Sequence, residues 1–119
     1  MTLAQFRKCV KDPTAPQSAR DALAAYNRLR KSGVITEHPD PENRRQRVAT
    51  DSRTVTLGGV QHVKPFFLSD TSVFIICPYC RNIHTHGSNS GDYTGGRVPH
   101  CSGTYKHRVY DYYIESMEG

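Results

Sequence analysis

Apolar residues recur every three or four positions between residues 18 and 33, and this periodicity predicts an amphipathic helix. The apolar stripe of this helix consists of Ala19, Ala22, Leu23, Tyr26 and Leu29. Ser18 followed by Asp21 resembles a capping box at its start, and Gly33 can close its end. A shorter helix is predicted from Leu3 to Val10, before the proline-containing stretch KDPTAP.

From Arg53 onward the chain is rich in β-branched and aromatic residues, which favours short strands separated by turns. The strand-like stretches are TVTL, VQHVKPFF, SVFIICP and YKHRVYDYYI. Gly58 and Gly59 are expected to form the tight turn of a hairpin. The pattern therefore predicts an α+β protein, in which an N-terminal helical segment is joined to a small antiparallel β domain.

Between these two parts, the stretch TEHPDPENRRQRVATDSR has no apolar periodicity and contains two prolines. It predicts a linker, within which a short helix from Pro41 to Ala49 is compatible with the sequence. The predicted organisation is a helical segment at residues 1–36, a basic linker at 37–52 and a β domain at 53–119. All three belong to one folded unit.

The chain has 119 residues, the usual size of one domain. Only 36% of them are apolar and none is tryptophan, so a metal or a crosslink would help to stabilise a thin core. The N-terminus carries charge where a secretion signal is apolar, and no stretch approaches the roughly 18 apolar residues of a membrane span. We expect a soluble protein in the reducing cytoplasm, without a membrane partner.

Three of the four cysteines occur together with histidines. Cys77-Pro-Tyr-Cys80 directly follows an apolar strand, as in a zinc knuckle, and HTH and HC sequences follow within about twenty residues. A redox CxxC normally begins a helix in a βαβ unit, and the sequence predicts no such unit here. The pattern therefore predicts a metal site. The remaining thiol, Cys9, is expected to be a small buried residue on a helix.

The choice of the other two ligands depends on strand geometry. In an extended chain His84 and His86 point to the same face, whereas the adjacent His100 and Cys101 point to opposite faces. The common Cys3His set favours Cys101 over His100, and Gly87 favours His86 because it lets the backbone turn beside the metal. The predicted Zn2+ ligands are Cys77, Cys80, His86 and Cys101, with His84 and His100 as alternates.

The pattern CPYC, HTHG and GGRVPHC, spanning residues 77–101, resembles that of small zinc-ribbon-like proteins of actinobacteria and their phages. Their pattern is CPYCG, HxHG and GxRxxHC. The resemblance implies a zinc-ribbon-like β domain and a bacterial or phage source, but it implies no activity, because the function of that group is obscure. This chain has Arg81 in place of the glycine after the second cysteine. A knuckle often needs a left-handed residue near that point, and Asn82 is expected to supply it.

A closed set of four ligands is typical of structural zinc, whereas catalytic zinc keeps a position for water. Carboxylates are sparse near the cluster, and neither HExxH nor HxE with PCxxC is present. We therefore expect a non-enzymatic module with no small-molecule substrate. The histidines beyond the ligand set keep a metal-dependent nuclease or hydrolase as an alternative.

The net charge is +5, and its surplus lies in the N-terminal part. Residues 1–52 contain ten Lys/Arg against six Asp/Glu, and residues 53–119 contain six against five. This favours a polyanionic partner, and nucleic acid is the partner we expect. The candidate contacts are Arg44, Arg45, Arg47, Arg97, Lys106 and Arg108. The alternatives are a phage-type protein that binds and modulates a host protein or defence complex, and an arginine-rich surface that is simply solvated.

Overall fold

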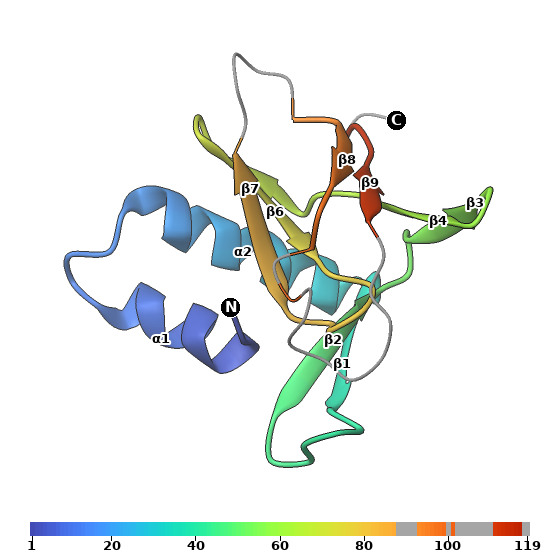
Figure 1. Ribbon diagram of the computed structural model, residues 1–119. Helices are drawn as coiled ribbons and strands as arrows, with labels where there is room; N and C mark the ends of the chain where they lie inside the picture. The colour runs from blue at the N-terminus through green and yellow to red at the C-terminus, as the bar shows by residue number, and fades with distance from the viewer. Residues whose placement is uncertain (88–92, 100, 102–110, 118–119) are drawn as a thin grey trace.

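A computed structural model describes residues 1–87, 93–99, 101 and 111–117, and within them the chain is an α+β protein (Figure 1). The helices are α1 (Leu3–Lys11) and α2 (Gln17–Lys31). The strands are β1 (Ile35–Pro39), β2 (Arg47–Asp51), β3 (Val55–Leu57), β4 (Val60–Val63), β5 (Phe67–Leu68), β6 (Ser72–Ile76), β7 (Ile83–Gly87), β8 (Gly95–Arg97) and β9 (Tyr112–Ile114). Neither of the two described helices has the length and apolar character that crossing a membrane requires.

Both predicted helices are present, but their caps differ from the prediction. The capping box lies at α1, where the Thr2 side chain accepts the Gln5 N–H and the Gln5 side chain accepts the Thr2 N–H. The box expected at Ser18 is absent, because Pro16 occupies the N-cap position of α2 and makes no side-chain cap bond. At its other end α2 closes on Gly33, whose φ is +87°.

The segment expected to be a linker forms part of the fold instead. Residues 37–52 include the end of β1, all of β2 and the loop between them, and β1 and β2 pair antiparallel. No helix forms from Pro41 to Ala49, because the Asp40 and Asn43 side chains accept N–H groups of the loop and shape it into turns. The backbone that carries Arg44 and Arg45 is therefore held in turns.

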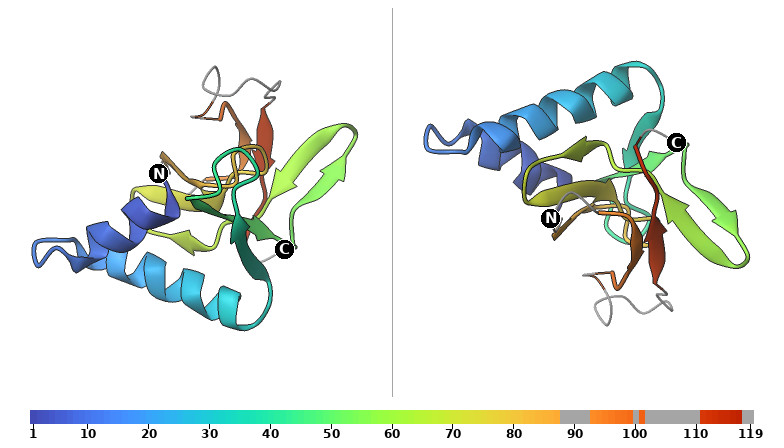
Figure 2. Two further views of the ribbon diagram at one scale, coloured as in Figure 1. Left: turned by 90° about the horizontal axis from the view of Figure 1, so that it is seen from below. Right: turned by 90° about the horizontal axis from the view of Figure 1, so that it is seen from above.

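The strands form three small sheets, with the orders β1-β2, β3-β4-β9-β8 and β5-β6-β7. The pairing is antiparallel except between β4 and β9, which run parallel, so the antiparallel β domain of the prediction is only partly correct. Gly58 and Gly59 turn β3 into β4 with φ angles of +58° and +82°, as the sequence predicted. This β3–β4 hairpin projects from the body of the molecule in both views of Figure 2.

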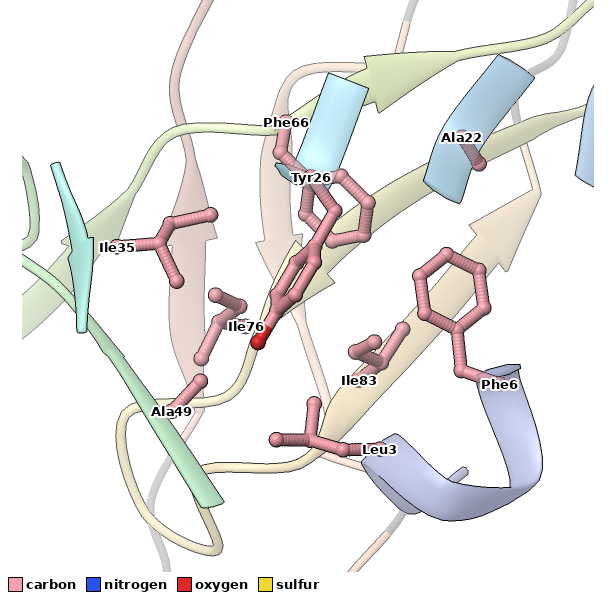
Figure 3. Packing of buried hydrophobic residues seen from close by; sticks show 9 residues of the cluster. All are labelled: Leu3, Phe6, Ala22, Tyr26, Ile35, Ala49, Phe66, Ile76 and Ile83. Carbon is pink, nitrogen blue, oxygen red and sulfur yellow. The ribbon is translucent and has the colours of Figure 1, made fainter. Parts of the chain in front are cut away.

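Strand β6 separates two hydrophobic cores by the simple alternation of its side chains. On one face Ile76 joins a core that includes α1, α2, β1 and β2, with Tyr26 at its centre (Figure 3). On the other face Val73 and Ile75 join a second core with β4, β9 and three cysteines. The partner strand β7 alternates in the same way, with Ile83 on the helical side.

One buried carboxylate ties the helices to the β1–β2 hairpin. The Glu37 side chain is 3% exposed and forms ion pairs with Arg7, Arg30 and Arg47, which come from α1, α2 and β2. The Tyr26 hydroxyl donates to the same carboxylate at 2.5 Å. Burial of Glu37 opposes its ionisation, but the hydrogen bonds from Tyr26 and Arg7 outweigh burial, and the pKa of this carboxyl is lowered.

Replacing Glu37 by Gln is expected to lower the free energy of unfolding at neutral pH by about 1–3 kcal/mol, because the guanidinium groups lose their shared buried anion. The pKa of Glu37 is lower in the folded protein than its ordinary value of 4.5. The difference between wild type and Glu37→Gln is therefore fully present above pH 4.5 and is lost as the pH falls through the folded-state value. Urea unfolding over this pH range measures both effects.

The matched control is Asp70→Asn, which neutralises an exposed carboxylate and should change stability by less than about 0.5 kcal/mol. Equal stability of Glu37→Gln and the wild type at neutral pH would show that this carboxylate does not tie the elements together.

Candidate metal centre

The turn between β6 and β7 is a cysteine knuckle. The Arg81 N–H donates to the Cys77 carbonyl at 2.9 Å, and the Cys77 N–H donates to the Asn82 carbonyl at 2.9 Å, so the turn is closed at both ends. The Tyr79 N–H points at Cys77 Sγ, 3.4 Å away, as amides in metal knuckles do. Arg81 has a φ of +61°, so this residue, and not Asn82, takes the left-handed conformation that the sequence analysis expected.

Four potential ligands meet at this turn: Cys77, Cys80, His84 and Cys101. Their ligand atoms all lie within 4.8 Å of one another, and all four residues are buried. Cys77 Sγ and Cys101 Sγ are 3.8 Å apart, too far for a disulfide bond, so the thiols are free. A buried Cys3His group of this kind can hold a metal ion.

The histidine in this group is His84, whereas the sequence analysis favoured His86. Both point to the same face of β7, as predicted, but His84 lies opposite Ile75 and nearer to the knuckle. Its Nε2 is 3.2 Å from Cys80 Sγ. His86 is two residues further from the knuckle, and its Nε2 contacts the Tyr112 hydroxyl instead. Gly87 is the last residue of β7, and the backbone turn expected after it lies outside the described residues.

Tyr112 connects the two histidines. Its hydroxyl lies 3.1 Å from His84 Nδ1 and 2.5 Å from His86 Nε2, and its side chain is fully buried. When His84 Nε2 binds a metal, Nδ1 carries the proton and donates it to the Tyr112 oxygen. The hydroxyl then donates to His86. Tyr112 therefore orients His84, and His86 holds Tyr112.

The electrostatics of the sulfurs favour a cation among them. A hydrogen bond from Cys77 lowers the pKa of the Cys80 thiol to about 4, and His84 adds to this effect. The same Cys77–Cys80 interaction raises the pKa of Cys77, while burial and then the charge on Cys80 raise that of Cys101. The pKa of Tyr112 is also raised, first by burial and then by charge on the cysteines. One thiolate forms readily, and a divalent cation would offset the repulsion that opposes the others.

The other predicted contacts that the structure describes lie in two places. Arg44 and Arg45 lie on the exposed β1–β2 loop, Arg47 begins β2 and Arg97 ends β8. His100, Lys106 and Arg108 lie outside the described residues. Cys9 was expected to be buried but is exposed on α1, because only Leu3 and Phe6 of that helix are buried.

Two functional candidates were missed from the sequence. Tyr112 was not among the predicted site residues, although its place in the apolar run YYI is a signal for a buried strand residue. Arg7 had no local signal, because its significance depends on the distant β1–β2 hairpin.

No family model matches this chain, and comparisons with curated proteins and with solved structures gave no significant match.

The assignment of His84 predicts unequal effects of two alanine substitutions on metal affinity. His84→Ala removes a metal-ligating nitrogen and should weaken Co2+ binding by more than about 100-fold. His86→Ala removes only the hydrogen bond to Tyr112, which in turn orients His84, and should weaken Co2+ binding by about 10–100-fold. Titration followed by the cobalt–thiolate absorption bands measures both affinities.

A Tyr112→Phe variant serves as the companion, since it removes the shared hydroxyl without a charge change. It should resemble His86→Ala. If His86→Ala lost more Co2+ affinity than His84→Ala, His86 would be the metal ligand and His84 the residue that supports it.

Proposed function

We propose that this protein is a zinc-stapled binding module without enzymatic activity, and that its partner is nucleic acid. The observation that carries the first part is the buried group of Cys77, Cys80, His84 and Cys101. A tetrahedral zinc with Zn–S bonds of about 2.3 Å places two sulfurs about 3.8 Å apart. The measured separation of Cys77 Sγ and Cys101 Sγ, 3.8 Å, fits this geometry. The β6–β7 hairpin with its knuckle supports the zinc-ribbon-like interpretation of this part.

The ligand set supports a structural role for the zinc. Four protein donors complete a tetrahedral shell, so no position remains for a reactive water. The group contains no carboxylate, and among the described residues His86, which lies outside it, is hydrogen-bonded to Tyr112. This arrangement supports the binding module over a metal-dependent nuclease or hydrolase.

Nucleic acid is favoured as the partner by the basic loop between β1 and β2. Arg44, Arg45 and Arg47 are exposed there, and the turn bonds of Asp40 and Asn43 fix the loop backbone. Phosphate contacts from arginine supply most of the affinity in sequence-independent binding. A fixed loop loses less conformational entropy on binding than a flexible linker would.

A protein partner is the second candidate, and the β3–β4 hairpin favours it. Val55, Leu57 and Val60 are 49%, 55% and 41% exposed, and Tyr113 on the neighbouring β9 is 37% exposed. Strand β3 is also an edge of its sheet, so its outer backbone groups can accept another strand. A phage-type protein that modulates a host protein would use such a surface. The β3–β4 hairpin is the part of the molecule that projects in Figure 2.

One pair of assays separates the two candidates. If nucleic acid is the partner, the zinc-loaded protein binds a fluorescein-labelled single strand of about 20 nucleotides, and log affinity falls linearly with log salt by about 0.7 per phosphate contacted. The Leu57→Lys variant, tested beside the wild type, should bind at least as well. Fluorescence anisotropy at several salt concentrations measures this.

Absence of binding at the lowest salt would exclude single-stranded nucleic acid as the partner. The protein-partner candidate predicts a stoichiometric complex, identified by mass spectrometry after pull-down from bacterial lysate, that survives nuclease treatment and is lost with Leu57→Lys. If that complex persists unchanged in Leu57→Lys, the hairpin is not its binding surface.

A further inference from the structure

A hollow of about 450 Å³ lies between the start of α1 and the β1–β2 loop. Its lining contains three arginines and no carboxylate: Thr2, Leu3, Ala4, Arg7, Asn43, Arg45, Gln46 and Arg47. By contrast, the charged residues that line a second hollow, beside the knuckle, are Asp40, Glu42 and a single arginine, Arg81. The two hollows flank the same loop, but only the first has a surplus of positive charge in its lining, so an anion is expected there.

The arginines of the hollow carry more positive charge than the fold neutralises. Arg7 and Arg47 share the buried carboxylate of Glu37 with Arg30, so three guanidinium groups surround one anion. Arg45 is exposed and forms no ion pair with any residue that the structure describes. Its donors are therefore available to an external anion, and the shared Glu37 holds the other two in place around it.

Backbone groups of α1 add to this site. The first turn of a helix has N–H groups without intrahelical acceptors, and the capping box satisfies those of Thr2 and Gln5 only. Leu3 and Ala4 are among the residues that line the hollow, and their N–H groups remain for an acceptor from outside the helix. A phosphate is the anion most often bound by such N–H groups together with arginine.

The metal knuckle supports both walls of the hollow. The Ile83 N–H donates to the Met1 carbonyl at 2.9 Å, which fixes the residue before the capping box. The Ala49 N–H donates to the Arg81 carbonyl at 2.9 Å, which fixes β2 two residues after Arg47. The turn that carries the cysteines thus sets the spacing between α1 and the loop.

We propose that this hollow binds a phosphate group of single-stranded nucleic acid, between the guanidinium groups of Arg7, Arg45 and Arg47 and the first-turn N–H groups of α1. The proposal rests on the function proposed above and assigns that function to one surface. A volume of about 450 Å³ accommodates a nucleotide-sized group, such as one unpaired nucleotide of a single strand.

The decisive variant is Arg45→Ala, because Arg45 is exposed and takes no part in the Glu37 cluster. We expect the zinc-loaded variant to bind the labelled single strand about 3- to 10-fold more weakly at low salt, with a salt slope smaller by about 0.7. Arg28→Ala is the matched control, since Arg28 has the same charge and is exposed on α2, away from the hollow. It should bind within about 1.5-fold of wild type.

A second readout is independent of nucleic-acid affinity. Inorganic pyrophosphate, titrated into ¹⁵N-labelled protein, should shift the amide resonances of Leu3, Ala4 and Arg45 and leave those of β3 unchanged. Strands with and without a 5′-phosphate identify the source of the anion. Equal affinity assigns the site to the internal backbone phosphate, and tighter binding of the phosphorylated strand assigns it to the chain end.

Wild-type affinity of Arg45→Ala, with no pyrophosphate shifts at α1, would overturn the site while nucleic-acid binding by another surface still stood. Absence of any binding by the wild-type protein at low salt would overturn both proposals. The two failures are therefore distinguishable.

Discussion

The meeting of three thiols and one imidazole at the β6–β7 turn is the constraint on which the rest of the structure depends. The second hydrophobic core has eight buried members, and three of them are the cysteines of this group. The remaining apolar surface there is small, and thiols packed together without a cation would repel one another as they ionise. Metal binding can supply this missing stability, since structural zinc in small domains contributes roughly 10–16 kcal/mol of apparent binding free energy.

The knuckle also acts beyond the second core. Its backbone accepts the Ala49 N–H and, through Ile83, donates to Met1, so it contacts both the β1–β2 hairpin and the start of α1. Glu37 then ties those same elements together through its three arginines. The molecule has a buried group of potential metal ligands on one side of this framework and a basic hollow on another, and backbone hydrogen bonds connect the two regions. This arrangement fits a structural metal site that positions a binding surface.

The sequence predicted what depends on local patterns. The stripe through Tyr26, the Gly58–Gly59 turn and the shared face of His84 and His86 follow from helical or strand periodicity, and the structure contains each of them. The grouping of Cys101 with the CxxC was also expected from the order of the motifs. Such features need only a few neighbouring residues to form.

What the sequence did not predict depends on tertiary contacts. The choice between His84 and His86 is decided by the pairing of β7 with β6 and by Tyr112, which is 26 residues further along the chain than His86. The β1–β2 hairpin was interpreted as a linker because its alternation is hidden by prolines and arginines, and its pairing is stabilised by the distant Arg7 and by the knuckle. Long-range contacts of this kind have no periodic signature.

The central claim is that the metal holds the second core together, and amide hydrogen exchange before and after chelation tests it most directly. Removing the metal is expected to reduce protection of the β6 and β9 amides, at Ile75 and Ile114, by at least about 100-fold, because the core loses its four-way crosslink. Restoring Zn2+ should restore protection. Unchanged protection of these amides in the metal-free protein would contradict the account.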